Sequence, residues 1–214
     1  GNNCTFIGNK EDIKEIHQSK NNKILSNVFI DEASEVLRGR NNILFLIGSQ
    51  HKILDHLLDR INIDMSSIEN FKHNIKYRSA YCEENKINYR HIIFPDKITA
   101  LSDYFPIKKV HPFYERYLNA FNEKVINLLP YIKNNPEAYL RTDTHLSFEG
   151  KVITSSVILN EFMSSEINFL ADALNELRGD EYEYLGDLGS KIEPKECEVH
   201  YKIRFKNIKR FDNM

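Results

Sequence analysis

Short apolar runs alternate with longer amphipathic segments along this chain. Residues 23–30 (KILSNVFI), 43–48 (ILFLIG) and 87–95 (INYRHIIFP) are apolar runs rich in β-forming residues, which predicts three strands. Residues 198–208 (EVHYKIRFKNI) alternate apolar and polar side chains strictly, which predicts a half-buried strand. A fifth strand is expected at 137–142 (EAYLRT).

The segments between these runs have helical spacing. The apolar residues of 51–61 fall on one helical face, and 69–86 is expected to form a long amphipathic helix. Further helices are expected at 113–125 and 167–179. Ser147 stands at the N-cap position of another expected helix, because its hydroxyl can accept a hydrogen bond from the first helical turn.

Strands that alternate with helices in this order indicate a three-layer α/β/α fold with a mostly parallel sheet. The length of 214 residues fits a single domain, residues 1–214. In folds of this class, functional residues gather on the loops that follow the carboxyl ends of the strands. Two polar segments hold this position: PDK at 95–97 and TDTH at 142–145.

Composition narrows the possible functions. The 31 acidic and 29 basic residues leave a formal charge of −2, so long-range attraction of a polyanion such as DNA is not indicated. The three cysteines form no CxxC pair, which gives no sign of a zinc ribbon or a disulfide framework. The printed sequence carries neither a signal peptide nor a run near the roughly 18 apolar residues of a membrane span.

The segment YLRTDTHLSFEG (139–150) carries the most specific chemistry. It places Asp143 two residues before His145, in the turn between an expected strand and an expected helix. A catalytic histidine needs a carboxylate that fixes its tautomer and stabilises the imidazolium, and it then activates a serine hydroxyl as a nucleophile. The pair indicates a serine-type ester or acetyl-transfer site; the other interpretation is a turn aspartate beside a surface histidine.

HIIFPDKITALSDYFP (91–106), followed by the 139–150 segment, resembles the SGNH-hydrolase-like domain of the alginate O-acetyltransferase family. In that family a strand ending in Pro-x-Lys and a Tyr-Pro-type segment precede an Asp-Thr-His motif. VLRGRNNILFLIG (36–48) is similar to the opening strand of the family, and YLGDLGSKI (184–192) is similar to its Gly-Asp-Leu segment. The resemblance covers roughly residues 36–192, in the family order.

The resemblance implies acyl transfer on a bacterial cell-surface polysaccharide or its precursor. His145 would be the general base, Asp143 would orient it, and Lys97 would help to shape the substrate site. The implied partners are a polysaccharide or sugar, an acetyl donor and a membrane acetyl-transfer partner. No cofactor and no metal are implied, and the implied location is the periplasm or cell envelope.

The nucleophile is not evident. The family carries it in a Gly-Asp-Ser motif after the Asp-Thr-His, and no such motif occurs before Met214, so this motif is expected beyond the printed sequence. Ser49, after an apolar strand and Gly48, is the candidate for a compact esterase. The alternative from another class is a glycan-binding or assembly module that kept the fold without the nucleophile.

Two further interpretations, a metal site and a basic binding face, rest on fewer residues. His145 and Asp143 are both metal-ligand types, but no third ligand at a recognisable spacing accompanies them. The basic face of 200–210 would suit an anionic glycan or a nucleic acid, whereas lysine and arginine on a solvated edge strand are the commoner arrangement.

Overall fold

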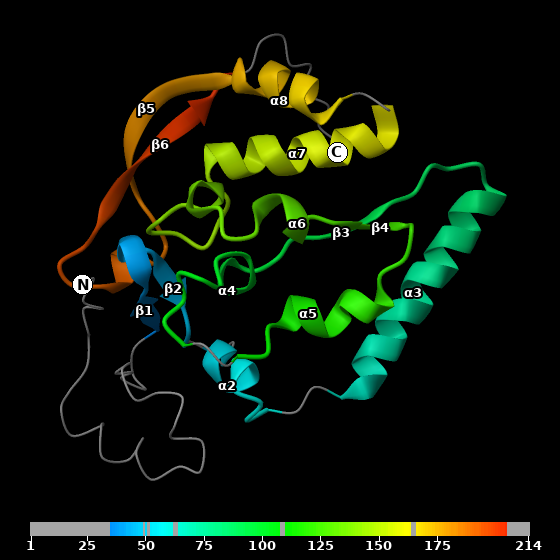
Figure 1. Cartoon of the computed structure of the whole chain (residues 1–214), viewed down its shortest axis with the longest axis horizontal. Helices are drawn as coiled ribbons and strands as arrows, with labels where there is room; N and C mark the ends of the chain where they lie inside the picture. The colour runs from blue at the N-terminus through cyan, green and yellow to red at the C-terminus, as the bar shows by residue number, and fades with distance from the viewer. Residues whose placement is uncertain are drawn as a thin grey trace, which may run out of the picture.

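The computed structural model describes residues 35–48, 50, 52–61, 64–107, 110–163 and 166–204 (Figure 1). The strand expected at 23–30 and the candidate nucleophile Ser49 lie outside these residues. Within the described ranges, no helix is both long and apolar enough to cross a bilayer.

Strands and helices are mixed along the chain, which confirms the α/β class. The strands are β1 (Val36–Arg38), β2 (Leu44–Leu46), β3 (His91–Ile93), β4 (Val125–Asn127), β5 (Arg178–Leu185) and β6 (Cys197–Ile203). They pair as β1–β2, β3–β4 and β5–β6, and only β3–β4 is parallel. The described residues therefore form three small sheets in place of the expected single, mostly parallel one. A parallel pair needs a crossover, which the helices between β3 and β4 provide.

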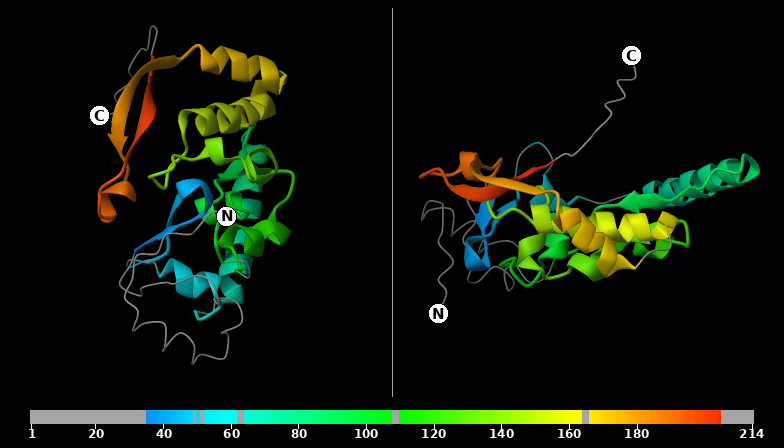
Figure 2. Two further views of the ribbon diagram at one scale, coloured as in Figure 1. Left: turned by 60° about the vertical axis from the view of Figure 1, so that its left-hand side comes forward. Right: turned by 90° about the horizontal axis from the view of Figure 1, so that it is seen from above.

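Most helices are short. The α-helices are α2 (Ile53–Leu57), α3 (Met65–Glu84), α4 (Lys97–Ala100), α5 (Phe113–Tyr117), α6 (Leu129–Ile132), α7 (Phe148–Met163) and α8 (Ile167–Asn175). Single 3-10 turns are η1 (Arg40–Asn42), η2 (Leu118–Ala120), η3 (Pro136–Ala138) and η4 (Gly189–Lys191). The long helix expected at 69–86 is confirmed as α3, which begins after Asp64, whose carboxylate accepts a hydrogen bond from the Ser66 amide. Figure 2 shows α3 projecting from the rest of the molecule.

The expected strand at 137–142 is wrong. Its first residues belong to η3, and its remainder makes a single antiparallel bridge between Tyr139 and Leu146. The strand β5 was not expected from the sequence. The strand expected at 198–208 is confirmed as β6, but its inward face is wrong, because His200 is buried between the rings of Tyr182 and Tyr184 while Val199 is exposed.

The β1–β2 hairpin is buried on both faces and joins the parts of the fold. Phe45 faces the main core, where its ring centroid lies 5.1 Å from that of Phe105 in an edge-to-face contact. Leu44 points to the opposite face and packs with Leu188 and Ile192, which follow β5. Because successive side chains of a strand alternate, this hairpin fixes the 184–192 segment against the core.

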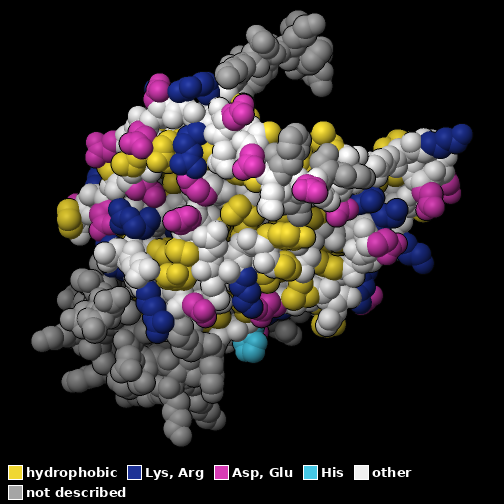
Figure 3. Space-filling view, turned by 45° about the horizontal axis from the view of Figure 1, so that its top comes forward, with side chains coloured by type: hydrophobic (Ala, Val, Ile, Leu, Met, Phe, Trp, Pro, Cys, Tyr) yellow, Lys and Arg dark blue, Asp and Glu magenta, His cyan; other side chains and the backbone are white. Residues whose placement is uncertain are grey.

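The face shown in Figure 3 carries acidic and basic side chains interspersed around groups of hydrophobic ones. This mixture agrees with the near balance of 31 acids and 29 bases. The expectation that the chain does not bind nucleic acid stays a prediction.

Candidate active site

The TDTH segment lies in a loop that connects η3 to α7. The first turn of α7 is capped as expected, because the Gly150 amide donates to Ser147 Oγ at 3.0 Å. Ser147 Oγ in turn donates to the carbonyl oxygen of Glu137. A Cβ atom on Gly150 would lie 1.9 Å from the carbonyl oxygen of Ala138, so glycine allows this close approach. The cap and the contact fix where the loop ends.

The structure brings Asp143 and His145 together, as the sequence predicts. His145 Nδ1 lies 2.6 Å from Asp143 Oδ1, and the His145 amide donates to the same oxygen at 2.9 Å. The other carboxylate oxygen accepts from Tyr184 Oη at 2.9 Å and from the Asp187 amide at 2.8 Å. These four hydrogen bonds hold the carboxylate in one orientation. The Asp143 side chain is only 1% exposed.

These contacts decide the charge of Asp143. Burial raises the pKa of its carboxyl group, but the hydrogen bonds from Asp187, His145 and Tyr184 outweigh burial and hold the pKa below its usual value. The same bond raises the pKa of Tyr184 to about 12, so its hydroxyl keeps its proton and remains a donor. Asp143 is therefore an ionised acceptor near neutral pH.

The carboxylate also fixes the state of the imidazole. An ionised carboxylate can only accept a hydrogen bond, so Nδ1 of His145 carries a proton toward Asp143. In the neutral ring this leaves Nε2 with its lone pair. The His145 side chain is 77% exposed, so Nε2 is accessible from solvent. The pair has the geometry of a general base and the carboxylate that orients it.

Lys97 lies beneath this loop rather than at its surface. Its Nζ atom donates to the carbonyl oxygens of Leu140 at 2.5 Å, Arg141 at 3.1 Å and Asp143 at 2.9 Å. These three acceptors match the three protons of an ammonium group, and the residue is 5% exposed. Burial lowers the pKa of Lys97 to about 7, although nearby carboxylates such as Glu198 partly oppose this. Lys97 therefore supports the loop from within the protein, and its expected part in shaping the substrate site stays a prediction.

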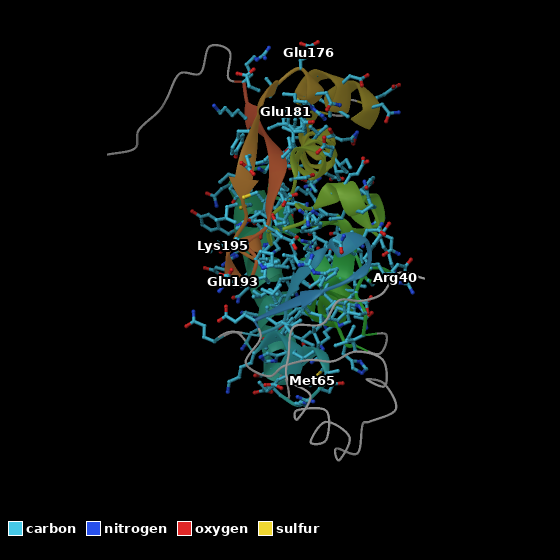
Figure 4. The ribbon with its side chains drawn as sticks, turned by 90° about the vertical axis from the view of Figure 1, so that its left-hand side faces the viewer. Arg40, Met65, Glu176, Glu181, Glu193 and Lys195 are labelled. Atoms are coloured by element: carbon cyan, nitrogen blue, oxygen red, sulfur yellow. The ribbon has the colours of Figure 1, made fainter. Side chains whose placement is uncertain are left out.

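The β5–β6 hairpin holds the other side of the loop. The Glu198 carboxylate accepts from the amide of Arg141 at 2.8 Å and from the amide and hydroxyl of Thr142, both at 2.6 Å. The amides of Leu188 and Gly189 donate to the Thr142 carbonyl oxygen. Figure 4 shows Glu193 and Lys195 at the turn end of this hairpin, which is the end that reaches the loop.

Sequence reasoning missed Tyr184, Asp187 and Glu198 as parts of the site. Asp187 accepts from the Thr144 amide at 2.8 Å and from the Thr144 hydroxyl at 2.5 Å. The only signal was that YLGDLGSKI stood out as a segment; nothing in its pattern indicated contact with the TDTH loop.

Asp143, His145 and Asp187 each place a ligand-type atom within 4.8 Å of the others, so the structure supplies the third metal-ligand type that the sequence did not reveal. Their oxygens already accept hydrogen bonds, those of Asp143 from His145, Tyr184 and Asp187, and those of Asp187 from Thr144. A cation would have to displace these donors. The arrangement fits an oriented imidazole better than a metal site.

The nucleophile is not placed by the described residues. In the described part of the chain, the side-chain partners of the His145 ring are Asp143 and Thr144. Ser147 is committed to capping α7 and to the Glu137 carbonyl. Ser49 lies outside the described residues, so its candidacy stays a prediction.

No model of a known protein family matches the chain, and no curated protein sequence is significantly similar to it. Two solved structures are similar, both of Bacillus cereus PatB1. The structure with a sulfonyl adduct matches with a TM-score of 0.51 at 17% identity, covering 79% of this chain and 55% of that chain. A second PatB1 structure matches with a TM-score of 0.44 at 17% identity, covering 67% of this chain and 54% of that chain. The chain thus spans about half the length of PatB1 and shares an α/β fold with that part of it.

Proposed function

We propose that this chain contributes the Asp–His pair of an acyl-transfer site that moves an acetyl group to or from a carbohydrate. The observation that carries the proposal is the 2.6 Å contact between His145 Nδ1 and the buried Asp143 carboxylate, with the rest of the ring open to solvent. This geometry is what a serine-activating histidine requires.

In the proposed reaction, Nε2 of His145 accepts the proton of a serine hydroxyl while the serine oxygen attacks the carbonyl carbon of an acetyl ester. The imidazolium, stabilised by Asp143, then returns the proton to the departing alcohol, which leaves an acetyl-serine. A sugar hydroxyl or water repeats the sequence in reverse roles and takes the acetyl group. Ser49 is the candidate nucleophile within the printed sequence.

The choice of a carbohydrate rests on likeness. PatB1 is a polysaccharide O-acetyltransferase, and the motifs quoted from 36–192 resemble a polysaccharide O-acetyltransferase family. The Asp–His pair is compatible with any acyl ester, so it does not select a substrate by itself. The match in fold is what supports a carbohydrate for the present chain. The same proposal includes peptidoglycan or another cell-surface polysaccharide as the substrate. It also includes export of the protein to the cell envelope.

The test is acetylation of the protein by p-nitrophenyl acetate, followed by intact-mass measurement and peptide mapping. One acetyl adduct on a serine is expected, and it should disappear in His145→Ala. The matched control is His73→Ala, which removes an exposed histidine of α3. If the adduct persists in His145→Ala, or if the wild-type chain takes up no acetyl group, the proposal fails for this chain. The second outcome would favour a glycan-binding module without turnover.

A further inference from the structure

A cavity of about 720 Å³ lies between α3, α5 and the end of β3, and no residue of the TDTH loop or of the β5–β6 hairpin lines it. In Figure 1, these elements lie on the side of the molecule away from β5 and β6. The volume is within the roughly 300–1,000 Å³ of pockets that hold small molecules. We infer that this cavity binds a neutral saccharide.

One wall of the cavity is a single face of α3. Ser66, Ser67, Asn70, Phe71 and Asn74 line it, and their spacing of three or four residues places them side by side on the helix. Within the described part of the chain, the side-chain amides of Asn70 and Asn74 make no hydrogen bond, and both side chains are exposed. Each amide offers both a donor and an acceptor, as paired sugar hydroxyls require.

The opposite wall is aromatic and fixed in place. Phe113, Tyr114 and Tyr117 of α5 line it, and the ring of Tyr117 packs edge-on against Phe71 at a centroid distance of 5.3 Å. Ser67 Oγ and Tyr117 Oη lie 2.7 Å apart, and this bond ties α3 to α5. The faces of such rings carry partial negative charge and attract the polarised C–H groups on one face of a sugar ring.

The charge of the lining selects against other ligands. Among the described residues that line it, Asp96 is the only charged one, and its carboxylate accepts from the amide and hydroxyl of Thr99. A lining that holds one carboxylate and, among its described residues, no lysine or arginine disfavours phosphates and acidic sugars. A wholly apolar ligand would take the amides of Asn70 and Asn74 out of water without replacing their hydrogen bonds. A neutral polyol with apolar ring faces satisfies both walls.

The inference does not depend on acyl transfer, because the cavity and His145 share no residue. It is tested by calorimetric titration of the protein with chitotetraose and cellotetraose, with tetragalacturonate as the anionic comparison. At least one neutral tetrasaccharide should bind, and tetragalacturonate should bind at least about tenfold more weakly.

The double variant Asn70→Leu/Asn74→Leu removes the polar wall and keeps the helix. Its affinity for the bound tetrasaccharide should fall at least about tenfold. Lys76→Leu, which puts a leucine on α3 outside the cavity, should bind like the wild type. The inference is overturned if neither neutral tetrasaccharide binds at about 10 mM. Equal binding of tetragalacturonate, or wild-type affinity in the double variant, would also overturn it.

Discussion

Lys97 and Asp143 are joined by a hydrogen bond to the main chain rather than by an ion pair between their side chains. The Nζ atom of Lys97 donates to the carbonyl oxygen of Asp143 at 2.9 Å, whereas the carboxylate of Asp143 faces His145. Lys97, the first residue of α4, therefore holds the main chain of Asp143 in place. The Asp143 carboxylate stays available to the imidazole of His145. Support of the loop and orientation of His145 are divided between two atoms of one residue.

Replacing Lys97 with methionine should destabilise the protein. The variant keeps the length of the side chain but removes the ammonium group that donates to the buried carbonyl oxygens of Leu140 and Asp143. Such groups cost about 1–3 kcal/mol each, so Lys97→Met should lower the free energy of unfolding by about 2–6 kcal/mol. Urea denaturation measures this, and Lys76→Met on the exposed face of α3 is the control. A loss no larger than that of the control would mean that the carbonyls do not need the amine.

The stability should also rise with pH through the titration of Lys97. Burial lowers its pKa to about 7 in the folded protein, whereas a lysine in the unfolded chain has a pKa near 10.4. Between these values the unfolded chain holds a proton that the folded protein has released. The free energy of unfolding should therefore increase from about pH 7 to about pH 10, by at most about 1.4 kcal/mol per unit from this residue.

Urea denaturation between pH 7 and pH 10 measures this slope, and Lys97→Met should reduce it because the titrating amine is gone. Lys76→Met should keep the wild-type slope. Identical slopes in the wild type and Lys97→Met would show that Lys97 stays charged through this range.

The parts of the site that follow from the sequence are those made by near neighbours. Asp143 and His145 are two residues apart, and Ser147 caps a helix that starts at the next residue, so local geometry was enough to predict both contacts. Tyr184 and Asp187 lie 41 and 44 residues from Asp143. Tyr184 lies on β5 and Asp187 follows that strand. The sequence pattern did not predict β5, so it could not predict these two contacts.

The strand expected at 137–142 failed for a related reason. The residues have a strand-like composition, but side chains satisfy several of their backbone groups. The Thr142 amide donates to Glu198, and the Leu140 carbonyl accepts from Lys97. With its hydrogen bonds taken by two charged side chains, this segment does not need a neighbouring strand. The pattern of apolar residues carries no information about such partners.

Asp143→Asn should remove a source of acid sensitivity. Burial raises the pKa of Asp143, but the hydrogen bonds outweigh burial and hold it below its usual value. Its stabilising contribution is therefore complete above the unfolded pKa, about 4, and is lost as the pH falls through the lower folded pKa. The free energy of unfolding of Asp143→Asn should fall less steeply below about pH 4 than that of the wild type. Asp172→Asn, on the exposed side of α8, is the control, and equal acid limbs in all three proteins would contradict the expectation.

The same substitution tests the orientation of the imidazole. An asparagine can turn its amide nitrogen toward Nδ1, which favours the wrong tautomer. If acetyl transfer depends on His145, its rate should drop about 10³–10⁴-fold in Asp143→Asn. Asp172→Asn should keep the wild-type rate, and a fall of less than tenfold in Asp143→Asn would assign the carboxylate to folding alone.

Gly186→Ala should disturb the site without touching a polar side chain. A Cβ atom on Gly186 would lie 2.2 Å from the carbonyl oxygen of Thr142 and 2.6 Å from its carbonyl carbon. Both atoms belong to the main chain, so the loop or the segment after β5 must shift, at a cost of about 1–3 kcal/mol. Because the next amide, that of Asp187, donates to Asp143 at 2.8 Å, the shift should also change the surroundings of the imidazole.

Thermal unfolding and the NMR signals of the His145 ring together measure this effect. Gly186→Ala should lower the melting temperature and move the His145 ring signals, whereas Lys195→Ala, at an exposed position nearby, should do neither. A variant that melts and resonates like the wild type would mean that the loop tolerates the extra methyl group. In that case the close approach of Gly186 to Thr142 would not be what keeps Asp143 in place for His145.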